Sequence, residues 1–166
     1  SGRDIIKIGA KLKTANDLVQ IAGRNIESRA IKTEKDIKYN TGNGSYIAEK
    51  ATLHETTHES ADGNYGVFAN GDINYSGTNI GVKGNAELKG TNVTIAAEKN
   101  IVHNQNYGSI ADGKQYKSSY DEILAGGDLN VGQNLIITAT GEKLTNQNSN
   151  EKYKAGTGNV NIIGGI

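Results

Sequence analysis

Residues 71–102 repeat one short phrase four times: Gly71-Asp72-Ile73-Asn74-Tyr75, Gly77-Thr78-Asn79-Ile80-Gly81-Val82, Gly90-Thr91-Asn92-Val93-Thr94-Ile95 and Lys99-Asn100-Ile101-Val102. In each copy an Asp or Asn, which we call the anchor, precedes apolar residues, and in the first three copies these stand two positions apart. Residues two apart point to the same side of a strand, so each copy predicts a strand of about three to five residues with one buried face. Asp and Asn suit the corner before such a strand, because their side chains hydrogen-bond to nearby backbone.

The phrase recurs on both sides of this stretch. Further copies are Gly2-Arg3-Asp4-Ile5-Ile6-Lys7-Ile8, Ala15-Asn16-Asp17-Leu18-Val19-Gln20-Ile21, Gly23-Arg24-Asn25-Ile26, Gly127-Asp128-Leu129-Asn130-Val131, Gln133-Asn134-Leu135-Ile136-Ile137 and Gly158-Asn159-Val160-Asn161-Ile162. The anchors Asp4, Asp17 and Asn25 are 13 and 8 residues apart, which gives a combined step of 21. A repeat of about twenty residues is the size of one coil of a parallel β-helix, or β-solenoid, in which strands of successive coils pair in parallel.

This fold predicts which side chains fill the interior, because strand alternation fixes the face of each apolar position. The expected inward-facing residues are Ile5, Ile8, Leu18, Ile21, Ile73, Val93, Ile95, Leu129, Val131, Leu135, Ile137, Val160 and Ile162. Only alternate positions need to be apolar, so a hydrophobic content of 35% is sufficient. The absence of Pro agrees, since Pro removes a hydrogen-bond donor from a strand ladder.

Two other β folds are less compatible with the sequence. A β-sandwich also has short alternating strands, but it separates them with longer hairpin turns and tolerates Pro at its edges. A calcium-binding β-roll needs tandem Gly-Gly-x-Gly-x-Asp repeats. The stretch Ala125-Gly126-Gly127-Asp128 does not have that spacing.

Composition excludes several classes of function. The 18 basic residues balance 18 acidic ones without long blocks of either sign, so neither nucleic acid nor an anionic membrane surface is an expected partner. No apolar run approaches the roughly 18 to 20 residues that span a bilayer, so we expect no membrane insertion. The absence of Cys excludes disulfides and thiolate chemistry.

Because the chain lacks Met and begins with Ser1-Gly2, we expect residues 1–166 to be a single β-helix fragment of a larger protein.

Three polar stretches lose the repeated phrase, at about residues 27–69, 104–125 and 147–157. We expect loops or hairpins extruded from the rod there, and Thr41-Gly42-Asn43-Gly44 has the composition of a hairpin turn. Insertions in solenoids often form the binding side. The candidate partner-binding residues in these stretches are Tyr39, Tyr46, Tyr107, Tyr116 and Tyr120. The alternative is that these tyrosines only pack the extrusions against the rod.

The stretch from Ala125 to Ala139, with Ala-Gly-Gly-Asp-Leu followed by Leu135-Ile136-Ile137, resembles the repeats of filamentous haemagglutinin and related exoproteins. Residues 144–148, 90–96 and 100–106 look like further copies, so the resemblance covers about two thirds of the chain. It implies a right-handed parallel β-helix in a very long protein that is secreted to the surface of a Gram-negative bacterium. The implied partners are an outer-membrane transporter during export and a receptor or glycan on a host or neighbouring cell. The implied roles are adhesion or contact-dependent growth inhibition.

His54-Glu55-Thr56-Thr57-His58 matches the H-E-x-x-H motif, in which two His on a helix bind zinc and the Glu acts as general base. The Thr-rich surroundings disfavour a helix, and in a strand the two His would be about 13 Å apart, too far for one zinc ion. Glu87 and Glu98, the candidates for a third ligand, lie in or beside predicted coils. We therefore expect no metal or other cofactor here, with His54 and His58 kept as zinc candidates.

Other catalytic arrangements are weak as well. Some β-helix proteins cleave acidic polysaccharides with clustered carboxylates, and stacked coils would align Asp4, Asp17, Asp72 and Asp128 in principle. Asn replaces Asp freely among the anchors, however, and Asn cannot act as a general acid or base. The sequence thus predicts a non-catalytic scaffold, and the alternatives are a β-helical carbohydrate-active enzyme or a zinc metalloprotease fragment.

Overall fold

The computed structural model describes residues 2–110, 113–143, 153–154 and 156–163, and this part of the chain is all-β with no helix. The strands are β1 (Ile5–Ile8), β2 (Lys11–Thr14), β3 (Leu18–Ala22), β4 (Ile26–Arg29), β5 (Ile31–Gly42), β6 (Ser45–Glu55), β7 (Thr57–Ala61), β8 (Tyr65–Ala69), β9 (Ile73–Ser76), β10 (Thr78–Val82), β11 (Ala86–Gly90), β12 (Val93–Ala96), β13 (Glu98–Ile110), β14 (Gly113–Ala125), β15 (Leu129–Val131), β16 (Leu135–Ala139) and β17 (Val160–Ile163).

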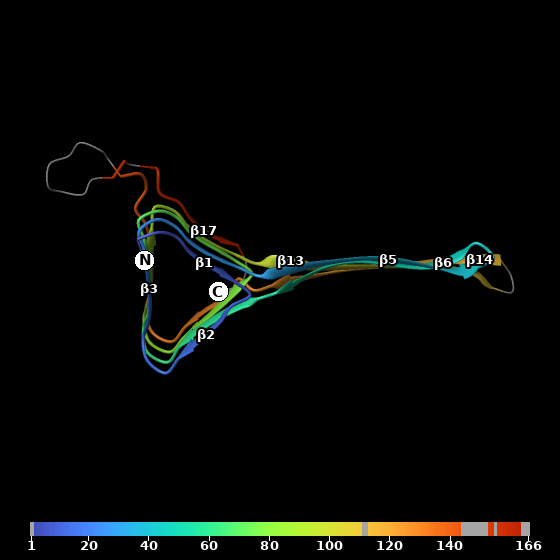
Figure 1. Cartoon of the computed structure of the whole chain (residues 1–166), viewed down its shortest axis with the longest axis horizontal. Helices are drawn as coiled ribbons and strands as arrows, with labels where there is room; N and C mark the ends of the chain where they lie inside the picture. Colours follow the sequence, from blue (N-terminus) through green and yellow to red (C-terminus); the bar gives the residue numbers. More distant parts are fainter. Residues whose placement is uncertain (1, 111–112, 144–152, 155, 164–166) are drawn as a thin grey trace.

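Three parallel sheets form the sides of a triangle in cross-section (Figure 1). Sheet A has the order β1-β4-β9-β12-β17, sheet B the order β2-β7-β10-β15, and sheet C the order β3-β8-β11-β16. The chain therefore passes through A, B and C in turn, and we call each passage a coil. Coil 1 is β1–β2–β3, coil 2 contains β4, β7 and β8, coil 3 is β9–β10–β11, and coil 4 contains β12, β15 and β16. The expectation of short strands pairing in parallel between successive coils is confirmed.

Most of the anchors lie at the corners before sheets A and C, where they form two ladders of hydrogen bonds, and Asn64 and Asn85 occupy equivalent positions. Before sheet A the order is Asp4, Asn25, Asp72, Asn92 and Asn159, and each Oδ1 accepts the backbone N–H of the next anchor at 2.8 to 3.2 Å. Asp17, Asn64, Asn85 and Asn134 form the second ladder in the same way. Anchors of successive coils without an inserted hairpin are 20 or 21 residues apart, as the sequence step predicted.

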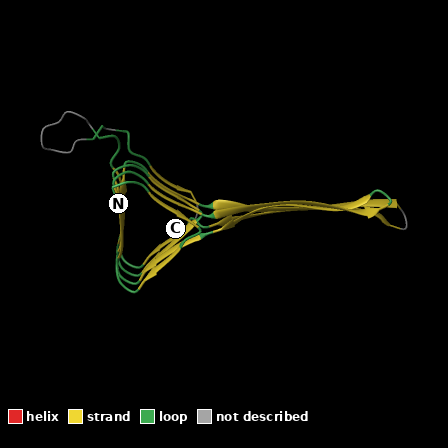
Figure 2. Ribbon diagram, in the orientation of Figure 1, coloured by secondary structure: helices red, strands yellow, loops and turns green. Residues whose placement is uncertain are grey.

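A fourth sheet, D, is antiparallel and extends far from the triangle (Figures 1 and 2). Its order is β14-β13-β6-β5, so it consists of two hairpins joined by the pairing of β6 with β13. Each hairpin is inserted between the sheet A strand and the sheet B strand of its coil, in coils 2 and 4. Coil 3 has no insertion and turns from β9 to β10 through Gly77, whose φ of 59° lies in the left-handed region.

The predicted bounds of the extrusions need correction. Residues 27–29 and 57–69 belong to β4, β7 and β8 of the parallel sheets, and the first hairpin is limited to residues 31–55. The second hairpin begins at residue 98 rather than 104, because Asn100-Ile101-Val102 is part of β13 and not a coil strand. The stretch 147–157 and the resembling residues 144–148 fall largely outside the described residues. The hairpin turn is confirmed: Gly42 pairs with Ser45, and Asn43 and Gly44 have φ of 50° and 73°.

Most of the expected interior residues face the core. Ile73, Val93, Ile95 and Leu129 are fully buried, and Ile5, Leu18, Val131, Leu135 and Ile137 pack against this cluster. Ile162, in β17, is half-buried.

Three of the expected interior residues are wrong: Ile8, Ile21 and Val160 are 48%, 60% and 45% exposed. In β1 and β3 the inward face runs from Ile5 to Lys7 and from Leu18 to Gln20, because residues two apart share a face. Ile8 and Ile21 lie three positions after Ile5 and Leu18 and therefore point outward. Val160 lies in β17, which has a sheet neighbour on only one side in the described structure.

Candidate interaction surface

Tyrosine side chains gather on one face of sheet D. Residues directly opposite each other in an antiparallel pair share a face, and Tyr46, Tyr107 and Tyr116 are successive partners across β6, β13 and β14. His103 and Tyr120 are also partners, four residues nearer the triangle, and therefore lie on the same face. We call this surface, made by Tyr46, His103, Tyr107, Tyr116 and Tyr120, the tyrosine face.

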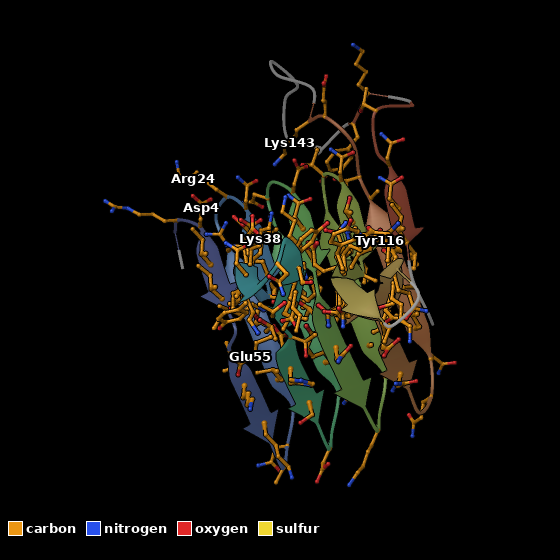
Figure 3. The ribbon with its side chains drawn as sticks, turned by 90° about the vertical axis from the view of Figure 1, so that its right-hand side faces the viewer. Asp4, Arg24, Lys38, Glu55, Tyr116 and Lys143 are labelled. Carbon is orange, nitrogen blue, oxygen red and sulfur yellow. The ribbon has the colours of Figure 1, made fainter. Side chains whose placement is uncertain are left out.

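The outer part of the tyrosine face is held by side-chain contacts. The rings of Tyr46 and Tyr107 stack with centroids 5.6 Å apart, and the Lys38 ammonium lies 4.4 Å from the centre of the Tyr46 ring. Gln105 Nε2 donates a hydrogen bond of 2.9 Å to the hydroxyl of Tyr116. Figure 3, which views sheet D from its tip, shows Lys38 and Tyr116 on different strands of the sheet. The aromatic groups are thus preorganised while Tyr116 is 52% exposed.

The part of the tyrosine face nearer the triangle is more polar. The rings of His103 and Tyr120 meet edge to face, 6.1 Å apart, and the Tyr120 hydroxyl donates to Glu122 Oε2 at 3.1 Å. That hydrogen bond raises the pKa of Tyr120 above its ordinary value, and Lys99, 2.6 Å from Glu122, lowers the pKa of the carboxyl. A shallow groove of about 490 Å³ runs along Ile101, His103 and Tyr120 to the charged residues of β5.

Tyr39 lies apart from the other candidate tyrosines. Its partner in β6 is Ile47, so it belongs to the opposite face of sheet D. Both residues are exposed, as are Leu53 and Ile123 on that face. Sheet D is therefore a single layer with apolar and aromatic groups exposed on both sides.

His54 and His58 do not form the helical zinc motif. His54 is near the end of β6, and His58 lies beyond the corner in β7, so the helix that H-E-x-x-H requires is absent. His54 Nδ1 is 3.3 Å from Asn100 Oδ1 and its Nε2 is 3.7 Å from Glu98, whereas His58 Nε2 bonds to Thr56 at 2.8 Å. Within the described ranges, no group of three or more His, Cys, Asp or Glu is placed to hold a metal ion.

The four Asp considered for carbohydrate chemistry are separated. Asp4 and Asp72 belong to the ladder before sheet A, with Asn25 between them, and Asp17 belongs to the ladder before sheet C. Asp128 precedes sheet B. Asp4 is engaged by the guanidinium of Arg24 at 2.9 Å (Figure 3). The anchors hold the corners and do not converge on one place.

Sequence reasoning missed a polar cluster inside the first coils. Lys7 Nζ forms an ion pair with Glu59 Oε1 and lies 2.5 Å from Gln20 Oε1 and 3.0 Å from the Tyr75 hydroxyl. Gln20 Nε2 and the Tyr65 hydroxyl donate to Glu59 Oε2 at 2.7 and 2.5 Å. All five side chains are buried. The sequence did contain a signal for this cluster. Lys7 lies two positions after the apolar Ile5, and Gln20 lies two positions from both Leu18 and Ala22, so each shares a strand face with apolar residues.

Burial shifts the protonation of this cluster. Desolvation lowers the pKa of Lys7, and the attraction of Glu59 offsets this only in part. Burial also raises the pKa of Tyr65 and of Tyr75 well above 10.0, and the nearby Glu59 adds to the effect. Burial in the cluster therefore makes the charged form of Lys7 less favourable than in water and favours the protonated forms of Tyr65 and Tyr75.

Comparison with known proteins gives no relative: no family model matches the chain, and no curated protein or solved structure matches it. Among the described residues, no helix is long and apolar enough to cross a membrane.

Proposed function

We propose that this chain is a non-catalytic segment of a right-handed parallel β-helix, belonging to a large secreted surface exoprotein of the filamentous haemagglutinin type. The segment acts as a scaffold for adhesion or for contact-dependent growth inhibition at the surface of a Gram-negative bacterium. The single observation that carries the proposal is the passage of the chain through sheets A, B and C in repeated order, with ladders of anchors at the corners.

The stacking supports a rod. Within sheets A, B and C each strand pairs only with strands of the neighbouring coils, so these sheets grow along one axis as coils are added. The anchors satisfy backbone N–H groups at the corners, where strand pairing stops. These features serve extension and shape.

Sheet D supports a role in contact with a partner. It extends away from the rod, and the tyrosine face combines exposed aromatic rings with Lys and Gln side chains. Tyrosine supplies a rigid, amphipathic contact surface at low entropic cost. The proposed partner is a receptor or glycan on a host or neighbouring cell.

A binding experiment tests the role of the tyrosine face. The purified chain is incubated with candidate host and bacterial cells, and bound protein is measured for the wild type, for the Tyr107→Ala/Tyr116→Ala variant and for Tyr39→Ala. Loss of the stacked and exposed rings should weaken binding at least ~10-fold, the equivalent of about 1.4 kcal/mol. Tyr39→Ala is the matched control on the opposite face and should bind as the wild type does.

Equal binding by all three proteins would contradict the role of the tyrosine face. The family proposal has its own test in the flanking gene sequence. A very long reading frame beside an outer-membrane transporter gene is the expected result, and a short secreted hydrolase would overturn it.

A further inference from the structure

The buried cluster contains the three groups that an amide-forming reaction needs. Lys7 in β1 supplies an amine, Gln20 in β3 of the same coil supplies a carboxamide, and Glu59 in β7 of coil 2 touches the nitrogens of both. Tyr65 and Tyr75 enclose them, with hydroxyls 3.0 Å apart. In the described structure, no buried side-chain nitrogen or oxygen lacks a hydrogen-bond partner, so the cluster is closed and fully connected.

We propose that Lys7 Nζ and the side-chain carboxamide of Gln20 condense into an intramolecular isopeptide bond, with Glu59 carrying the protons. This goes beyond the scaffold role, because it assigns a covalent modification to the interior of the rod. Glu59 alone would satisfy a buried lysine. Gln20 adds a carbonyl that faces the amine and an NH₂ that faces the same carboxylate, which is the arrangement that amide exchange requires.

The reacting atoms are already close. Since Lys7 Nζ is 2.5 Å from Gln20 Oε1 and a C=O bond is about 1.2 Å long, Nζ lies within about 3.7 Å of the carbonyl carbon. Fixed contact at such distances replaces an encounter in solution and lowers the barrier strongly. Desolvation also favours the neutral amine, which is the nucleophilic form, and this follows from the lowered pKa of Lys7.

The reaction balances without an added reactant. Glu59 accepts a proton from the Lys7 ammonium, and the freed Nζ lone pair attacks Cδ of Gln20 to give a tetrahedral intermediate. Glu59 then returns the proton to Nε2, and the Cδ–Nε2 bond breaks as the Nζ–Cδ amide forms. Nζ keeps a single proton as the new amide N–H, and ammonium carries the others away. No oxidation or reduction takes place.

The product would join β1 to β3 and close coil 1 covalently across 13 residues. β1 belongs to sheet A and β3 to sheet C, so the cross-link would connect these two sheets through the interior. Tyr65 and Tyr75 act here as positioning residues, since the Tyr65 hydroxyl orients Glu59 and the Tyr75 hydroxyl accepts from Lys7.

Mass spectrometry of the folded wild-type chain tests the proposal. The expected intact mass is that of the sequence less one ammonia, and the expected tryptic digest contains residues 4–11, uncleaved after Lys7, joined to residues 14–24. Separate, unmodified peptides with normal cleavage after Lys7 would overturn the proposal. Peptide mapping is necessary because Asn43-Gly44 can also lose ammonia by cyclisation, in a different peptide.

Two variants test the roles of the groups. Glu59→Gln keeps the size of the side chain but removes the proton carrier, so it should show the full sequence mass. A cross-link that forms equally in Glu59→Gln would overturn the role of Glu59. Gln20→Met removes the carboxamide, should show the full mass, and should lose structure at a lower temperature than the wild type. If Glu59→Gln does not fold by circular dichroism, the wild-type peptide map still decides whether the bond exists.

Discussion

At the scale of single residues, the anchors explain why Asp and Asn exchange freely in the repeat. The ladder needs an acceptor oxygen that reaches the next backbone N–H, and both side chains provide one. Asn adds a donor, as in the bond of 2.9 Å from Asn92 Nδ2 to Asp72 Oδ1. An Asp among the anchors therefore needs no catalytic explanation.

Interior side chains should contribute far more stability than those of sheet D. Ile95 is fully buried between sheet neighbours, so Ile95→Ala should lower the free energy of unfolding by about 2 to 5 kcal/mol. Tyr116→Ala, at an exposed position of β14, should cost less than about 1 kcal/mol. Urea denaturation monitored by circular dichroism measures both. Similar losses in the two variants would argue against the interior assigned to Ile95.

The buried tyrosines predict a loss of stability at alkaline pH. In the unfolded chain Tyr65 and Tyr75 lose their protons as the pH rises through 10.0, whereas the folded state keeps them because burial raises both pKa values. The stability that they contribute is thus complete below pH 10 and falls above it. Lys7 has the opposite effect on stability. Because burial lowers its pKa in the folded state, its contribution to stability increases as the pH rises toward 10.5, its pKa in the unfolded chain.

Phenolate absorbance during a pH titration measures this effect. The phenolates of Tyr65 and Tyr75 should form together with the loss of the circular dichroism signal. Titration of every tyrosine in one reversible phase, with the fold intact, would contradict the burial of Tyr65 and Tyr75.

The sequence alone does not determine which alternating set of residues in a strand faces the interior. Ile5-Ile6-Lys7-Ile8 alternates equally well with Ile5 and Lys7 or with Ile6 and Ile8 on one face. Hydropathy alone selects the wrong residue, because the partner that stabilises buried Lys7 is Glu59, 52 positions away. For Ile73, Val93 and Ile95 no polar competitor exists, and the expectation is confirmed.

At the scale of elements, sheet D depends on the joining of its two hairpins. Its outer strands β5 and β14 each have one neighbour, and nearly every residue of β5 is exposed. An isolated two-stranded hairpin is marginal in water, whereas four strands share more ladder hydrogen bonds and cross-strand contacts. The contact between β6 and β13, including the Tyr46–Tyr107 stack, makes one element out of two insertions.

Removal of the second hairpin should therefore destabilise the first. Replacing residues 99–124 by an Asn-Gly turn keeps Glu98 and Ala125, which are paired at the base of the hairpin. The parallel sheets should stay folded, and backbone amides of β5 and β6 should exchange with deuterium much faster than in the wild type. Unchanged protection of β5 and β6 would show that the first hairpin is stable alone.

The hairpins were only partly predictable. Gly42-Asn43-Gly44 marked the first turn, because positive φ at successive positions favours Asn and Gly. The start of the second hairpin could not be predicted. Asn100-Ile101-Val102 has the sequence pattern of a coil strand, but it belongs to β13 and pairs with β14. The alignment of Tyr46, Tyr107 and Tyr116 depends on strand register between distant segments, which no local pattern specifies.

At the scale of the whole molecule, the central claim is that the chain winds in coils whose strands stack in parallel and in register. Figure 3 shows the coils as neighbouring strips, with the hairpins projecting toward the viewer. The rod, the ladders of anchors and the position of sheet D all follow from this winding. Any other arrangement of the same strands would separate the Cα partners of successive coils.

Engineered disulfides test that winding most directly, because the chain contains no Cys. Glu27 and Asn74 are Cα partners in β4 and β9, and Thr94 is the partner of Asn74 in the next strand, β12. Neighbouring strands are about 4.8 Å apart, within the Cα separation of about 4.4 to 6.8 Å that a disulfide needs. Glu27→Cys/Asn74→Cys and Asn74→Cys/Thr94→Cys should therefore oxidise readily in the folded protein, whereas Glu27→Cys/Thr94→Cys, two strands apart, should stay reduced. Failure of both near pairs, or efficient oxidation of the distant pair, would contradict the stacked coils.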